Sequence, residues 1–408
     1  MKIKYLLIAV FCLCFFDMLA QTKKENTFEV YGFAMMDAGY NFKTINPDWY
    51  DALRVTKLPA SKNEFLPDGK VFYSVRQSRF GVKSFTPTSI GNLSTKFEFD
   101  MFGVGNYAGQ TTIRLRHAYG EIGKFLAGQT NSAFMDGDVF PNSLEYWGPT
   151  GMVFFRNIQI RYTPLMTSQD NLAFALEAPG ASADPGKLKD RTELETVKQV
   201  YNVPDLTGHY RYTGSFGYIQ LGGIVGSIKW RDVSDTAVFQ LNGSAVRWGG
   251  TLSSNINIGK KAVFRIQGVY GEGMENYMND APIDIGVKKN TEGDTLTQPI
   301  KGAALPVWGV TAFVDVNWSK YFSSSFGYSV ETIDIDKLTV DDVNLMSPST
   351  YKQGQYGLVN LLYYPVNNVM AGVEFNFGRR DNYDGFHYTI SEVRFAFKYN
   401  FSKIFSWN

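Results

Sequence analysis

Strict alternation of apolar and polar side chains is the feature of this sequence that most constrains its fold. From Leu93 to Met101, odd positions carry Leu, Thr, Phe, Phe and Met, whereas even positions carry Ser, Lys, Glu and Asp. From Val393 to Phe401, aromatic and aliphatic residues again alternate with Arg, Ala, Lys and Asn. Successive side chains of a strand point to opposite faces, so each segment is predicted to be a strand with one apolar and one polar face.

The same pattern recurs along the whole chain and predicts about sixteen antiparallel strands, an even number as in bacterial single-chain barrels. The predicted strands lie near residues 28–42, 71–85, 91–103, 111–122, 124–130, 152–163, 170–179, 203–213, 215–228, 244–258, 260–273, 304–319, 321–334, 353–363, 368–379 and 390–401.

The connections between these strands are alternately long and short. Long segments include 43–70, 131–151, 180–202, 229–243, 274–303 and 335–352, whereas tight turns lie at Gly123, Gly214 and Gly259. Long extracellular loops and short periplasmic turns are typical of outer-membrane barrels. A soluble sandwich also alternates within its strands but has no reason to alternate its connections. The predicted fold is an all-β transmembrane barrel with both termini in the periplasm.

The N-terminus is predicted to be a cleaved signal peptide over residues 1–20, because Lys2 and Lys4 precede a short apolar run. An uncleaved anchor is the alternative, although the run is too short to span a bilayer as a helix. The barrel domain then covers residues 21–408 and contains no cysteine, since Cys12 and Cys14 belong to the signal. Its acidic and basic residues balance, which gives no indication of nucleic-acid binding.

Basic residues on the predicted strands are expected to face the lumen. A charge facing lipid at the bilayer midplane costs about 2–4 kcal/mol, so these side chains should point inward. The candidates for a substrate path that selects anions are Arg79, Lys96, Arg114, Arg116, Arg161, Arg394 and Lys398. The alternative is that these cations pair with Glu98, Asp100 and Glu121. His117 has the parity of the lipid face.

Segment 131–151 is the candidate constriction loop, since the third long loop of porins often folds into the lumen. It contains Asp136, Asp138 and Glu145 but no Lys or Arg. An acidic loop opposite a basic wall would create a transverse field. An ordinary exposed loop is the alternative, because most loops lie at the surface.

An enzyme is not predicted. The chain has three histidines and lacks Gly-x-Ser-x-Gly, His-Glu-x-x-His and P-loop motifs, and neither cofactor nor metal is expected. An outer-membrane barrel hydrolase and a closed structural or adhesive barrel are the alternatives to a channel. No plug domain precedes the barrel, which favours passive diffusion over energised transport.

Several motifs together resemble the DcaP-like outer-membrane porins. They are Tyr31-Gly32-Phe33, Arg76-Gln77-Ser78-Arg79-Phe80-Gly81, Arg114-Leu115-Arg116-His117-Ala118-Tyr119-Gly120, Leu126-Ala127-Gly128-Gln129-Thr130 and Gln159-Ile160-Arg161-Tyr162-Thr163. The resemblance implies a trimeric channel of Gram-negative bacteria for small anionic solutes, dicarboxylates or aromatic acids among them. It also implies roles for Arg79, Arg114, Arg116 and Arg161.

Both ends of the predicted barrel depart from the usual pattern. Members of the family can carry a coiled-coil segment before the barrel, but only Gln21 to Thr27 precede the first predicted strand, so a trimer should form through the barrel wall. Phe401 resembles the C-terminal assembly signal of outer-membrane barrels, yet Ser402 to Asn408 follow it. Either these residues form a periplasmic tail, or the last strand extends further.

Overall fold

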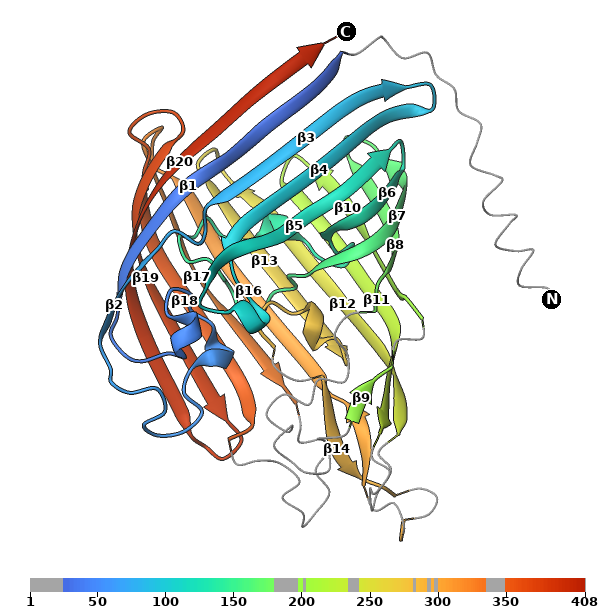
Figure 1. Cartoon of the computed structure of the whole chain (residues 1–408), viewed down its shortest axis with the longest axis vertical. Coiled ribbons are helices and arrows are strands. Elements are labelled where there is room, and N and C mark those ends of the chain that lie inside the picture. Colours follow the sequence, from blue (N-terminus) through green and yellow to red (C-terminus); the bar gives the residue numbers. More distant parts are fainter. Residues whose placement is uncertain are drawn as a thin grey trace, which may run out of the picture.

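The structure is a computed structural model that describes residues 25–179, 197–200, 203–233, 242–281, 284–291, 295–296, 300–334 and 349–407. The predicted signal peptide and parts of the long segments 180–202, 229–243, 274–303 and 335–352 lie outside these ranges. The described residues form a tilted antiparallel barrel with short helices inside the ring (Figure 1).

Most strands agree with the predicted segments. Residues 75–78 interrupt the predicted strand 71–85, the predicted strand 152–163 begins only at residue 156, and the strands at 197–199, 285–289 and 300–304 fall largely in predicted loops. The strand bounds are β1 (Asn26–Asn41), β2 (Lys70–Ser74), β3 (Arg79–Thr88), β4 (Gly91–Phe102), β5 (Thr111–Ile122), β6 (Phe125–Asn131), β7 (Arg156–Met166), β8 (Asp170–Glu177), β9 (Val197–Gln199), β10 (Asp205–Gly214), β11 (Gly217–Asp232), β12 (Gly243–Ile258), β13 (Ala262–Glu272), β14 (Ile285–Lys289), β15 (Ile300–Ala304), β16 (Pro306–Asn317), β17 (Phe322–Ile333), β18 (Tyr351–Tyr363), β19 (Val369–Asn382) and β20 (His387–Trp407).

The ring closes between the first and last strands. β1 pairs with β20 over its whole length, from Asn26 opposite Trp407 to Asn41 opposite Glu392. β2 and β3 both pair with β1, so together they occupy one strand position of the barrel. β9 pairs only with the end of β11 and extends the sheet there. The eighteen-stranded sheet is therefore a barrel with sixteen strand positions, which confirms the predicted fold class. β20 reaches Trp407, so residues 402–407 are not a tail and the predicted last strand ended too early.

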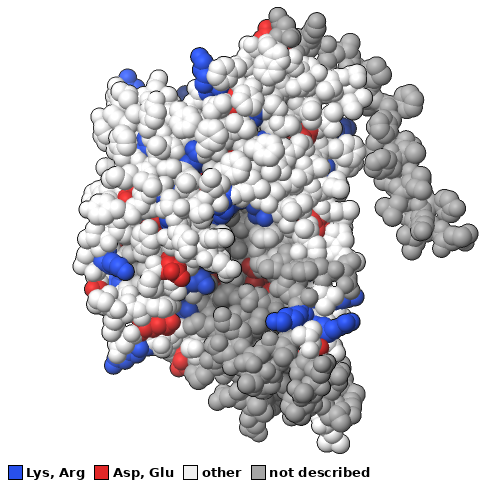
Figure 2. Space-filling view, viewed as in Figure 1, with Lys and Arg blue, Asp and Glu red and all other residues white. Residues whose placement is uncertain are grey.

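The outer and inner faces of the strands differ as the alternation predicts. On β20, Phe395 is 56% exposed and Phe397 is 51% exposed, whereas the intervening Ala396 is buried. Most of the strand surface visible in Figure 2 is uncharged. The buried residues of each strand face the lumen, so their burial indicates that other segments of the chain fill the lumen.

Three segments fill much of the lumen, and we call them the inner loops. They are residues 42–69 with η1 (Pro47–Trp49) and η2 (Val55–Lys57), residues 132–155 with η4 (Gly137–Val139), and residues 273–281 with η6 (Glu275–Tyr277). Their short helices lie inside the ring in Figure 1. The chain outside the inner loops has one further short helix among the described residues, η3 (Gly105–Tyr107).

The inner loops pack against inward-facing apolar residues of the strands. One buried cluster joins Leu53, Val55 and Leu58 to strand residues such as Tyr356. A second cluster joins Phe134 and Tyr277 of two inner loops to strand residues Ile224 and Val269. The apolar core of this molecule therefore lies within the barrel.

Loop 42–69 also connects the two sides of the β1–β20 seam from within. Arg394 of β20 donates from Nη2 to the carbonyl oxygen of Asp51 at 2.8 Å, and Arg380 of β19 donates to the carbonyl oxygen of Thr56 at 3.1 Å. Asp51 pairs with Arg76, which follows β2, at 2.5 Å. Main-chain carbonyls of a loop are thereby satisfied by strand guanidinium groups.

Candidate functional site

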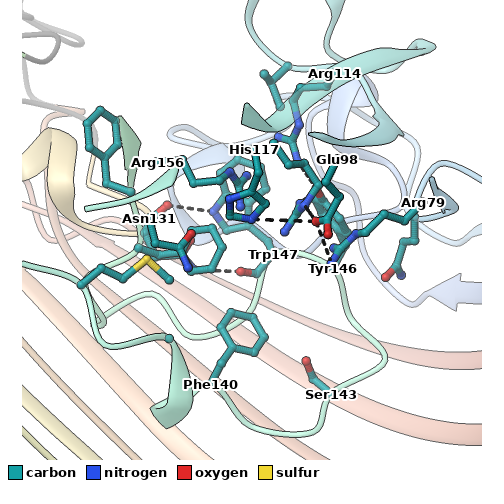
Figure 3. A pocket seen from close by; sticks show the side chains of 18 of the residues that line it. Arg79, Glu98, Arg114, His117, Asn131, Phe140, Ser143, Tyr146, Trp147 and Arg156 are labelled. Atoms are coloured by element: carbon teal, nitrogen blue, oxygen red, sulfur yellow. Dashed lines mark hydrogen bonds and ion pairs between the residues drawn. The ribbon is translucent and has the colours of Figure 1, made fainter. Parts of the chain in front are cut away.

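A cavity of about 850 Å³ remains between the inner loops and one arc of the barrel wall. We call its strand cations the basic wall: Arg79, Lys96, Arg114, Arg116, Arg156 and Lys398. Loop 132–155 also lines the cavity, with residues that include Phe140, Pro141, Asn142, Ser143, Tyr146 and Trp147. Figure 3 shows Arg79, Arg114 and Arg156 around the cavity, with Phe140 and Ser143 across from them.

Two carboxylates of β4 pair with four cations of the basic wall. Glu98 lies 3.4 Å from Arg79, 3.2 Å from Lys96 and 3.1 Å from Arg116. Asp100 lies 2.8 Å from Arg114 and 2.6 Å from Arg116. These pairs form because alternate residues of β4 point inward beside the arginines of β5. The predicted alternative of pairing therefore applies to these four cations.

Tyr146 connects this network to loop 132–155. Its hydroxyl group donates to Asp100 at 2.5 Å and also contacts Arg114 and Arg116. Its ring stacks on Phe102 with a centroid separation of 3.9 Å. The network thus holds the loop against the basic wall, and its cations also line the cavity.

Arg156 and Lys398 differ from the other cations of the basic wall. Among the described residues, neither forms an ion pair with a carboxylate. Arg156 lies over Phe154 at 5.1 Å, and Lys398 lies over Phe33 at 5.0 Å. Arg156 was absent from the predicted site because its sequence parity is opposite to that of Gln159 and Arg161. It is the first residue of β7, where the chain leaves an inner loop and strand parity has not yet been established.

His117 lies in the lumen, so its predicted lipid-face parity is wrong. β5 has one extra residue, Arg116, between the pairs Glu98–His117 and Phe99–Leu115. Such a β-bulge redirects the side chains that follow it. Arg116 and His117 therefore both point inward, and His117 contacts Thr130 at 2.9 Å. Tyr119, opposite Lys96, shares this corrected face.

Two predicted path residues lie outside the cavity. Arg161 is on the lumen side of β7 but donates to Gln159 at 2.9 Å and to the carbonyl oxygen of Asn131. Arg394 is fully buried beneath loop 42–69 and pairs with Glu392 at 2.9 Å. Both arginines contact protein groups instead of the open space.

The acidic residues of loop 132–155 do not oppose the basic wall as a charged face. Asp136 accepts hydrogen bonds from Tyr218 at 2.8 Å and Ser253 at 2.6 Å and pairs with Arg211. Asp138 pairs with the same arginine at 2.5 Å. Both carboxylates therefore anchor the loop to the β10–β12 wall. The predicted transverse field between an acidic loop and a basic wall is not present in this geometry.

Glu145 is buried at the junction of two inner loops. Its carboxyl group accepts hydrogen bonds from the main-chain N–H groups of Leu53 and Trp147 at 2.9 Å and of Gly148 at 2.6 Å. Burial raises the pKa of Glu145 to about 8, against the opposing effect of Arg394. Burial thus favours the protonated form of Glu145. The six cations of the basic wall share two ionised carboxylates, an excess of four positive charges.

The fold and this lumen define the chain as a porin-like outer-membrane channel, and the comparisons agree. The sequence matches the DcaP outer membrane protein family over residues 19–281. The chain belongs to that family, whose members are channel proteins and not enzymes. It is a protein of the outer membrane of Gram-negative bacteria. A search of curated proteins finds no match.

Several solved structures share the fold of this chain. The outer membrane channel DcaP of Acinetobacter baumannii superposes with a TM-score of 0.73 at 20% identity, covering 94% of this chain and all of that one. The anion-selective porin from Comamonas acidovorans gives 0.57 at 9% identity, covering 92% and 100%. OmpT of Vibrio cholerae gives 0.52 at 12% identity, covering 94% and 100%. No helix among the described residues is long and apolar enough to cross a membrane.

Proposed function

We propose that this channel is a passive diffusion pore that prefers small hydrophilic anions, dicarboxylate-like solutes among them. The observation that carries the proposal is the excess of four positive charges around the cavity. Clefts lined by one sign of charge raise the local concentration of the opposite ion. Anions should therefore enter the cavity more readily than cations of the same size.

The constriction in this proposal is the passage between loop 132–155 and the basic wall. Loop contacts support it, because the main-chain N–H groups of Leu144 and Glu145 donate to Glu374 of β19 at 2.7 and 2.8 Å. The main-chain N–H group of Gly151 donates to Ser329 of β17 at 2.8 Å. These hydrogen bonds hold the second half of the loop against β17 and β19, inside the lumen.

The proposal includes removal of residues 1–20 as a signal peptide, periplasmic termini, and a homotrimer formed through the outer barrel wall. One solved structure of the related fold, OmpT of Vibrio cholerae, is described as a trimer form. Chemical crosslinking of the protein in native membranes tests the oligomer. Crosslinked species that end at three protomers support it, and a monomer alone would overturn it.

The decisive experiment measures the reversal potential of the purified protein in a planar bilayer under a tenfold KCl gradient. A reversal potential with the sign expected for chloride permeation supports the proposal. The magnitude of this potential should decrease at molar salt, because the screening length there falls to about 3 Å. A potential of the sign set by potassium would overturn the anion preference. Absence of conductance would instead favour a closed structural barrel.

A further inference from the structure

We infer that Arg156 is the residue that contacts permeating oxyanions directly, with Lys398 as a second contact, whereas the other four cations of the basic wall serve the protein's own carboxylates. The inference rests on the proposed anion preference and assigns it to particular side chains. Arg156 and Lys398 belong to β7 and β20, so they line the cavity from different parts of the wall.

Carboxylates of the protein compete with a solute for the donors of the basic wall. Glu98 and Asp100 occupy Arg79, Lys96, Arg114 and Arg116 at 2.6–3.4 Å. A solute carboxylate must displace or share these partners to bind there. Arg156 and Lys398 form no such pair among the described residues, so their charges remain available to a solute.

The Arg156 guanidinium group lacks a partner for one of its nitrogen atoms. Its Nη1 atom is buried and has no hydrogen-bond partner within the protein. Arg79, Arg114 and Arg116 line the same cavity and carry the same charge, so they repel it. A buried unpaired charge among like charges is destabilising, and an anion in the cavity would relieve that cost.

The Arg156 side chain is also placed where a solute in the cavity could reach it. Figure 3 shows the Arg156 side chain beside the cavity, next to His117 and near Asn131. A guanidinium group offers parallel N–H donors that match a carboxylate in bidentate fashion. The Phe154 ring lies 5.1 Å from the guanidinium carbon and restricts its position. Arg156 is therefore both charged and oriented for an oxyanion.

The test measures single-channel conductance in potassium acetate of increasing concentration, because a contact site makes conductance saturate. Arg156→Gln should raise the half-saturating concentration about tenfold, since a hydrogen bond to a charged group is lost. Arg156→Lys should restore the charge but only part of the affinity, because Lys lacks the planar fork. Lys398→Gln should raise the half-saturating concentration by a smaller factor than Arg156→Gln does.

Arg161→Gln is the matched control, since it removes the same guanidinium group from the same strand but from an arginine that lies outside the cavity and donates to Gln159 at 2.9 Å. Its half-saturating concentration should change less than about twofold, because the bound solute does not contact this arginine. Equal shifts in Arg161→Gln and Arg156→Gln would overturn the inference in favour of a simple count of lumen charges. An unchanged Arg156→Gln channel would overturn it as well.

Two further readouts keep the result interpretable. Arg156→Gln removes an unpaired charge, so the thermal unfolding temperature in detergent should be equal or higher, which separates loss of binding from loss of fold. The reversal potential of the unchanged protein decides the proposed function independently. If that protein prefers chloride while Arg156→Gln still saturates normally, only the inference about Arg156 fails.

Discussion

Glu145 shows how a single buried residue can couple loop position to pH. Its folded-state pKa of about 8 lies above the ordinary value of 4.5. The docked loop therefore holds the proton more tightly than an undocked loop would. The stabilisation is fully present below about pH 4.5 and is lost as the pH rises through about 8.

We therefore expect single-channel current to fluctuate more at pH 9 than at pH 5, as loop 132–155 undocks more often. Ionised Glu145 would also reduce the positive excess of the cavity, so chloride preference should fall over the same range. Glu145→Gln has no titrating group at this position and should remove both pH effects. Equal pH dependence in Glu145→Gln would assign the effect to another residue.

At the scale of elements, the three inner loops depend on one another through Arg54. Its guanidinium group lies 4.3 Å from the Trp49 ring and 4.0 Å from the Trp147 ring, and it pairs with Asp280 at 2.7 Å. Asp280 also accepts from the hydroxyl group of Thr56 at 2.6 Å. One side chain therefore contacts all three inner loops.

Arg54→Ala should loosen the inner loops and raise single-channel conductance. The two ring contacts and the ion pair together should contribute about 2 kcal/mol or more at a partly buried site. Lys43→Ala is the control, because Lys43 belongs to the same loop as Arg54 and its ring contact is with Tyr388 of β20, at 5.4 Å. A conductance unchanged by Arg54→Ala would mean that strand contacts alone hold the loops.

The strands were predictable from sequence because apolar residues on the outer face alternate with polar residues on the inner face. The inner loops were not, because their packing depends on residues distant in sequence, such as Arg380 with Thr56. His117 was assigned to the wrong face because a bulge at Arg116 changes parity without a sequence signal. Arg156 was missed for a similar reason, since it lies at the first position of its strand. Arg394 is covered by a loop whose fold the strand pattern does not encode.

At the scale of the whole molecule, the length of β20 determines how completely the barrel closes. Residues 402–407 pair with residues 26–31 of β1. Truncation after Phe401 removes these pairs and leaves an open strand edge. With about 1 kcal/mol for each net hydrogen bond, the loss should amount to several kcal/mol.

We therefore expect the truncated protein to convert from folded to unfolded gel mobility at a lower temperature than the full chain. Lys403→Ala in the full chain tests the side chain without removing the backbone pairs and should change this temperature little. If truncation leaves the temperature unchanged, residues 402–407 contribute nothing to closure.

The contacts of loop 42–69 across the seam have a consequence for lateral opening of the barrel. Separating β1 from β20 requires rupture of the strand ladder and also of the inner bonds from Arg394 to Asp51 and from Arg380 to Thr56. The joint between the two ends of the chain is thus reinforced on its inner side. Amide hydrogens along this joint should exchange with solvent as slowly as those between strands adjacent in sequence.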